Sequence, residues 1–92
     1  MRAMMTMQAA VVVEQGVTFA VVAVRPEVTT YTYRAIRARQ EFQKVFKNMP
    51  IILMSMDSNG QPHYYGRRDI VNFLKSIKVT QIPWREFTFM PV

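Results

Sequence analysis

The chain contains one histidine, His63, and no cysteine, and these two facts limit the chemistry that its side chains can perform. Without cysteine there is no disulfide, no thiolate nucleophile and no thiolate metal site. A lone imidazole can still act with a carboxylate, and Asp57 and Asp69 are the candidate partners of His63. A hydrolase or isomerase built in this way would need a concave pocket that holds His63 and a carboxylate.

The sequence offers no further support for such an activity. The residues present do not form the sequence pattern of a serine, histidine and acid triad. They also show no spacing of metal ligands and no glycine-rich loop that could hold a phosphate. We therefore expect no enzymatic activity, no metal and no cofactor.

The sharpest candidate for binding is the segment Gly66, Arg67 and Arg68, which lies at the start of an expected helix. Glycine lets the backbone approach an anion, the free N–H groups of a helix start point outward, and two guanidinium groups add positive charge. A phosphate or carboxylate could bind there. Alternatively, the Asp69 carboxylate could itself satisfy the helix dipole or pair with an arginine.

A second group of positive charges lies on the long helix expected between residues 30 and 48. Its members are Arg34, Arg37, Arg39, Lys44 and Lys47. With a net charge of +6, these side chains could contact the phosphates of nucleic acid, and bases could stack on Tyr31, Tyr33 or Tyr64. The alternative is a solvated helix face that keeps the protein soluble.

Length and composition indicate a single domain, residues 1–92, that associates with itself. Half of the 92 residues are apolar, which is more than so small a sphere can easily hide. We expect a homo-oligomer, most simply a dimer, that acts as a non-catalytic interaction module. Three aromatic residues near the end of the chain are candidate interface anchors: Trp84, Phe87 and Phe89. The alternative for Trp84 is that it seals the open end of the core.

The longest apolar runs, residues 9–13 and 19–24, fall far short of the roughly 20 residues that a bilayer requires, so no membrane span is expected. Residues 1–5 lack the features of a signal peptide and are interpreted as part of the mature protein. The lack of cysteine fits a reducing, cytoplasmic location.

The first element has two possible structures. If Gly16 ends a helix, the alanines and methionines of residues 3–15 are in favourable positions, and this is the interpretation that we favour. If Gln15 and Gly16 form a hairpin turn, residues 9–13 become a strand, which their three valines prefer. Residues 17–24 are apolar at almost every position, so they predict the central strand of a sheet covered on both faces.

The remaining elements follow from apolar spacing and turn residues. Thr29 or Thr30 is expected to cap the long helix. Further along the chain, Asn59 and Gly60 are expected to supply the positive φ angles of a tight hairpin. The inward side chains of that helix are expected to be Tyr31, Ala35, Ala38, Phe42, Val45 and Phe46. Further elements are strands 51–56, 61–65 and 82–89 and a helix over 68–77. The predicted fold is α/β (α+β), with a mixed sheet of about four strands and two or three helices.

Residues 50–77 carry a resemblance to a known family. Pro50 before a strand, followed by a hairpin, Gly66 and an amphipathic helix, resembles the C-terminal half of thioredoxin-like domains. The paired cysteines of that family are absent, so the resemblance implies a fold and no redox activity. Residues 64–70 together with residues 82–84 also resemble short bacterial proteins of unassigned function.

Overall fold

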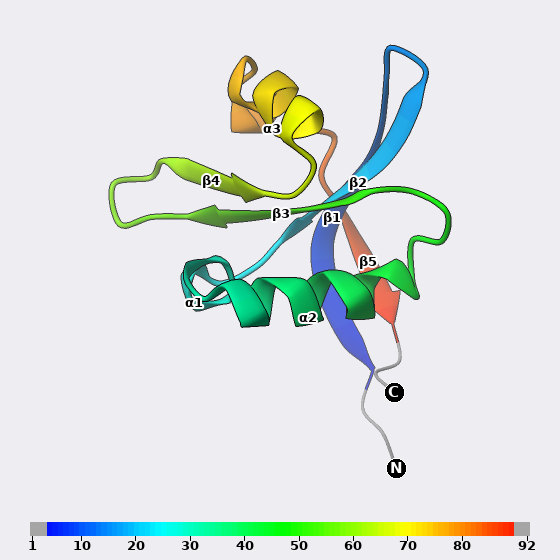
Figure 1. Cartoon of the computed structure of the whole chain (residues 1–92), viewed down its shortest axis with the longest axis vertical. Helices are drawn as coiled ribbons and strands as arrows, with labels where there is room; N and C mark the ends of the chain where they lie inside the picture. Colours follow the sequence, from blue (N-terminus) through cyan, green and yellow to red (C-terminus); the bar gives the residue numbers. More distant parts are fainter. Residues whose placement is uncertain (1–3, 90–92) are drawn as a thin grey trace.

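The computed structural model describes residues 4–89 as one domain built on a mixed sheet (Figure 1). Among these residues, no helix is both long enough and apolar enough to cross a membrane. The strands are β1 (Met5–Glu14), β2 (Val17–Ala23), β3 (Ile51–Met56), β4 (Pro62–Tyr65) and β5 (Arg85–Phe89). The helices are α1 (Pro26–Thr30), α2 (Thr32–Gln43) and α3 (Arg68–Lys75), and a short 3-10 helix, η1, spans Val79–Gln81.

The five strands lie in the order β4-β3-β2-β1-β5. Strands β2 and β3 are parallel, and every other neighbouring pair is antiparallel. The predicted fold class is therefore confirmed, with five strands in place of about four. The prediction that residues 17–24 form the central strand is also confirmed, because β2 lies in the middle of the sheet and side chains from Phe19 to Val22 are buried.

The helix that we favoured for residues 3–15 is wrong for residues 4–15, residue 3 lying outside the described residues, and the alternative hairpin is correct. Residues Met5–Glu14 form β1, which pairs with β2 on one side and with β5 on the other. Gln15 and Gly16 connect the first pair with φ angles of 50° and 78°. Such paired positive φ angles match the twist of a two-residue hairpin. Pairing on both edges outweighs the helix propensity of the alanines and methionines.

The long helix expected between residues 30 and 48 is instead two helices. Tyr31 separates α1 from α2 with an extended backbone, and its side chain is 50% exposed, so it does not point inward. Thr29 and Thr30 do not cap a helix, because their hydroxyl groups donate to the carbonyl of Pro26. The helix ends at Gln43, and Val45 beyond it is exposed, while Ala35 and Phe46 are buried as predicted.

The two faces of the sheet are covered by different helices, with α3 on one side and α1 and α2 on the other (Figure 1). On the α3 side the core consists of Ala10, Phe19, Val21, Ile52, Met54, Ile70, Val71, Leu74 and Ile82. On the α2 side it consists of Met7, Ala9, Ala20, Val22, Ala35, Phe46, Ile51 and Leu53. Alternate residues of each inner strand point to opposite faces, so the same strands supply both cores.

The hairpin between β3 and β4 is confirmed, although only one of its two predicted positive φ angles is present. Gly60 has a φ of 78°, and Asn59 does not adopt a positive φ. The Gly60 N–H donates to the carbonyl of Asp57, while the Asp57 carboxylate accepts hydrogen bonds from the N–H groups of Asn59 and Gln61. An Asx residue that bonds the backbone after it stabilises such a turn.

The last strand is shorter than predicted, since β5 begins at Arg85 and residues 82–84 precede it. The three aromatic side chains at this end of the chain do not share one face. Trp84 packs against the α3-side core, whereas Phe87 and Phe89 pack against the α2-side core.

Candidate anion-binding site

Three cationic side chains from two helices line one hollow beside β4. They are Arg39 of α2 and Arg68 and Lys75 of α3. The hollow has a volume of about 430 Å³, and its remaining lining residues are Tyr64, Tyr65, Gly66, Val71 and Asn72. Because β4 is an edge strand of the sheet, residues from both helical layers can reach this position. We call it the basic hollow.

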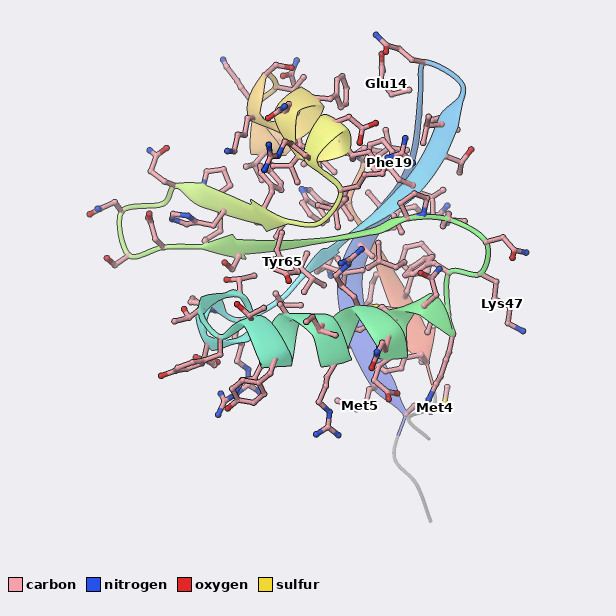
Figure 2. All side chains as sticks on the ribbon, in the orientation of Figure 1. Met4, Met5, Glu14, Phe19, Lys47 and Tyr65 are labelled. Carbon is pink, nitrogen blue, oxygen red and sulfur yellow. The ribbon has the colours of Figure 1, made fainter. Side chains whose placement is uncertain are left out.

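Arg39 is held in place by two contacts. Its Nε donates a hydrogen bond of 3.1 Å to the carbonyl of Ile51, and its guanidinium carbon lies 5.8 Å from the centre of the Tyr65 ring. Figure 2 shows Tyr65 between the β3–β4 hairpin and α2. A guanidinium that is fixed by one N–H and by an aromatic face keeps its other N–H groups available for an anion.

Arg68 and Lys75 lie on the same side of α3 because seven residues correspond to two helical turns. Val71 and Asn72, at the positions between them, also line the basic hollow. The opposite side of α3 carries the buried residues Ile70 and Leu74. The apolar packing of α3 therefore fixes the direction in which both cations point.

Among residues 4–89, no carboxylate lines the basic hollow. The ion pairs within residues 4–89 are Lys44 with Glu41, His63 with Asp57, and Arg67 with Asp69. None of them involves Arg39, Arg68 or Lys75. The positive charge of the hollow is thus not balanced by an acidic side chain in the described part of the chain.

Tyr64 contributes a buried hydroxyl group to this region. Its oxygen has no hydrogen-bond partner among residues 4–89. Burial raises the pKa of Tyr64, so the phenol remains protonated at neutral pH and keeps its ability to donate.

Of the predicted anion-binding segment, only Arg68 contributes a charge to the hollow. Arg67 instead forms two hydrogen bonds to Asp69, of 2.8 Å and 2.9 Å. This contact is the main cause that lowers the pKa of Asp69 and raises that of Arg67. The second interpretation from the sequence, that Asp69 pairs with an arginine, is therefore correct.

Gly66 borders the hollow for a reason that concerns packing. A Cβ atom at this position would lie 2.5 Å from Cδ1 of Ile52 and 3.0 Å from the carbonyl oxygen of Ile51. The φ angle of 154° is also unfavourable for a residue with a side chain. The glycine is thus required where the chain passes close to β3.

The five basic residues predicted for nucleic-acid binding are dispersed. Only Arg39 lines the basic hollow, and Arg37 is exposed on α2. Arg34 lies over the rings of Tyr31 and Tyr33, at 5.1 Å and 5.9 Å from their centres. Lys44 pairs with Glu41. Lys47 extends from the turn after α2, at the right of Figure 2.

The sequence prediction did not include Lys75. The signal that could have found it is its spacing of seven residues from Arg68 within one amphipathic helix. The inward direction of Arg39 also has a sequence signal, because Arg39 follows the buried Ala35 by four residues and so lies on the same side of α2.

A second hollow, of about 360 Å³, contains His63 and Asp57, as the hydrolase or isomerase hypothesis required. The His63 Nε2 lies 2.9 Å from Oδ2 of Asp57. The pKa of the Asp57 carboxyl group is lowered, mainly because it accepts a hydrogen bond from the Gln61 N–H. The contact with His63 is the second cause of the lowering. Ser55, which lies opposite His63 in the sheet, shares a hydrogen bond of 2.7 Å with Thr29.

These contacts do not form a catalytic relay. No hydrogen bond joins His63 to Ser55 or to another hydroxyl group within residues 4–89, so no nucleophile is placed beside a base. The same part of the chain holds no group of three residues arranged to bind a metal ion. The contact between His63 and Asp57 joins strand β4 to the turn that follows β3.

The three predicted interface residues are half-buried. Trp84 donates from Nε1 to the carbonyl of Val79 at 3.0 Å. Phe87 packs edge-to-face on Phe46 with the ring centres 5.2 Å apart, and Phe89 contacts Phe42 in the same way at 6.1 Å. All three pack against the core of the domain. Their role in an interface stays a prediction.

No protein-family model, curated protein or solved structure matches this chain. The resemblance to thioredoxin-like domains and to short bacterial proteins therefore stays a prediction.

Proposed function

We propose that the protein binds nucleic acid through the phosphate groups, which enter the basic hollow. The observation that carries this proposal is the meeting of Arg39, Arg68 and Lys75 in one hollow that is lined by no carboxylate of residues 4–89. Phosphate binding by Lys and Arg releases condensed counterions, and this supplies most of the sequence-independent affinity for nucleic acid.

The charge of the whole molecule favours a polymer of phosphates as the ligand. The net charge of +6 includes exposed cations outside the hollow, such as Arg37 and Lys47. Such a field attracts polyanions from a distance and accelerates their binding. The rings of Tyr64 and Tyr65 beside the cations supply surfaces against which a base could stack.

The test compares two double variants that lose the same charge. Arg68→Gln with Lys75→Gln removes two cations of the basic hollow, and Arg37→Gln with Lys47→Gln removes two exposed cations elsewhere. Fluorescence anisotropy would measure the affinity for a labelled single strand and a labelled duplex at several salt concentrations. We expect the hollow variant to lower the slope of log affinity against log salt by about two, one for each phosphate contact.

The control variant should retain most of this slope. Equal losses in the two variants would mean that net charge alone attracts nucleic acid and that the hollow is not the site. Absence of binding at low salt by the unmodified protein would refute the proposal as a whole. Titration with inorganic phosphate would separate recognition of a single phosphate from recognition of a polymer.

We also propose that the protein self-associates as a non-catalytic interaction module. Two observations support this second function: half of the residues are apolar, and no strand within residues 4–89 pairs with the outer edge of β5. Sedimentation equilibrium tests it directly. A monomer at high micromolar concentration would contradict it.

A further inference from the structure

The two edges of the sheet differ in how well they are protected. Strand β4 has four residues and begins at Pro62, which has no N–H group to donate to another strand. Strand β5 has five residues and contains neither proline nor glycine. It lies at the other edge of the sheet, and no strand within residues 4–89 pairs with its outer side. An edge of this kind can pair with another chain.

The side chains of β5 restrict how such pairing can occur. Phe87 and Phe89 pack on the α2-side core, and Glu86 and Thr88 are exposed on the other face. A shift by one residue would move the two phenylalanines to the polar face, so only registers that differ by two residues remain.

We infer that β5 pairs antiparallel with β5 of a second copy, about a two-fold axis through Phe87. This inference rests on the self-association proposed above. In this register Phe87 faces Phe87 of the partner copy, Glu86 faces its Thr88, and Arg85 faces its Phe89. All five residues of β5 are then paired, and no charged side chain faces another of the same sign.

The neighbouring registers are less favourable. An axis through Glu86 would place this carboxylate opposite its own copy, and like charges directly opposite each other destabilise a sheet. An axis through Thr88 would pair only three residues of β5. The register through Phe87 also leaves the basic hollow accessible, because β4 and β5 lie at opposite edges of the sheet.

The chain has no cysteine, so engineered cysteines can report the register without interference. Glu86→Cys and Thr88→Cys change exposed side chains and leave the core intact. Opposed residues in antiparallel strands have Cα atoms roughly 4.5–5.5 Å apart, which is within the range that a disulfide spans. Under mild oxidation we expect a cross-linked dimer only when the two variants are mixed, and none from either variant alone.

Other cross-linking patterns would overturn the inferred register. Cross-linking of Glu86→Cys alone would place the axis at Glu86, and cross-linking of Thr88→Cys alone would place it at Thr88. A mixture of Thr88→Cys with Asn59→Cys, at the tip of the β3–β4 hairpin, measures random collisions. A yield from that control equal to that of the test mixture would also overturn the inference.

Sedimentation equilibrium of the unmodified protein separates this inference from the self-association on which it rests. A dimer together with no cross-link in the test mixture would refute the β5 pairing and retain self-association. A monomer would refute both. Because each copy carries a net charge of +6, we expect added salt to strengthen the dimer.

Discussion

The two helical layers hold the same sheet by different means. On the α3 side, one short helix buries Ile70, Val71 and Leu74 directly against the strands. On the α2 side, a longer helix buries only Ala35 from its own length. The contrast shows that the length of a helix is a poor guide to how much it contributes to the core.

Because α2 buries so few side chains of its own, polar contacts and the turn after the helix attach it to the rest of the domain. Gln43 donates from Nε2 to the carbonyls of Phe46 and Met49, at 2.8 Å and 2.7 Å. Arg39 donates to the carbonyl of Ile51 on β3. The largest apolar anchor on this side, Phe46, lies in the turn after the helix and packs on Phe87. The α2 layer is therefore fixed at its end and by side-chain hydrogen bonds.

The largest expected effect comes from Gly66→Ala, where the chain enters the α3 layer. The added methyl group would displace the end of the Ile52 side chain and would also press on the Ile51 carbonyl oxygen, at 3.0 Å, and on Cα of Ile52, at 3.3 Å, which cannot move without disturbing β3. We expect thermal unfolding to show a loss of about 3 kcal/mol or more, since overpacking and backbone strain add. Gly60→Ala is the control, because nothing lies within 4 Å of its added Cβ and only the positive φ opposes it. Similar losses in the two variants would contradict the close-packing explanation.

The next prediction compares truncation of one apolar side chain in each layer. Leu74→Ala leaves a cavity in the α3-side core, where this side chain is fully buried, and should cost about 3 kcal/mol. Phe42→Ala removes a half-buried ring from α2 and should cost less. Urea unfolding of both variants measures the difference. A larger loss for Phe42→Ala would reverse the proposed contrast between the layers.

A smaller effect is expected from Gln43→Ala, which tests the polar attachment of α2. Two backbone carbonyls lose their amide donor, and the expected cost is about 1–2 kcal/mol. Gln40→Ala, on the exposed side of the same helix, controls for the change in helix propensity. If the two alanine variants unfold at the same urea concentration, the Gln43 hydrogen bonds do not hold the layer.

The smallest effect concerns how the stability contributed by the β3–β4 hairpin, which contacts α1, depends on pH. The pKa of Asp57 is lowered in the folded protein, first by the Gln61 N–H and next by His63. A lowered folded-state pKa gives stability that is present above the unfolded pKa, about 3.9, and is lost as pH falls through the folded value. Below about pH 4, we expect the melting temperature of the Asp57→Asn variant to depend less on pH than that of the unmodified protein. Parallel curves for the variant and the unmodified protein would contradict this.

The comparison of layers also explains which elements the sequence could predict. The apolar residues of α3 repeat at helical spacing, so its face and its start at Arg68 follow from local periodicity. The turn at residues 57–60 follows from its Asx and glycine residues. In the α2 layer the same spacing predicted the buried Ala35 and Phe46. It could not predict the attachment through Gln43, because backbone carbonyls accept these hydrogen bonds and no residue pattern displays them.

Long-range pairing accounts for the main error in the fold. The alanines and methionines of β1 favour a helix locally, and pairing with β2 on one edge and with β5 on the other makes an extended chain favourable there. The same limit applies to the candidate site. Arg39 and Lys75 are far apart in the sequence, and packing on opposite faces of the sheet brings both to the β4 edge.

The place of β5 in the sheet has a consequence for the order of folding. The β1–β2 hairpin needs only a two-residue turn, and such local structure forms within microseconds. Arg85, in contrast, pairs with Ala9 near the other end of the described chain. During synthesis on the ribosome, β1 must wait for its second neighbour until all the other strands and helices have emerged.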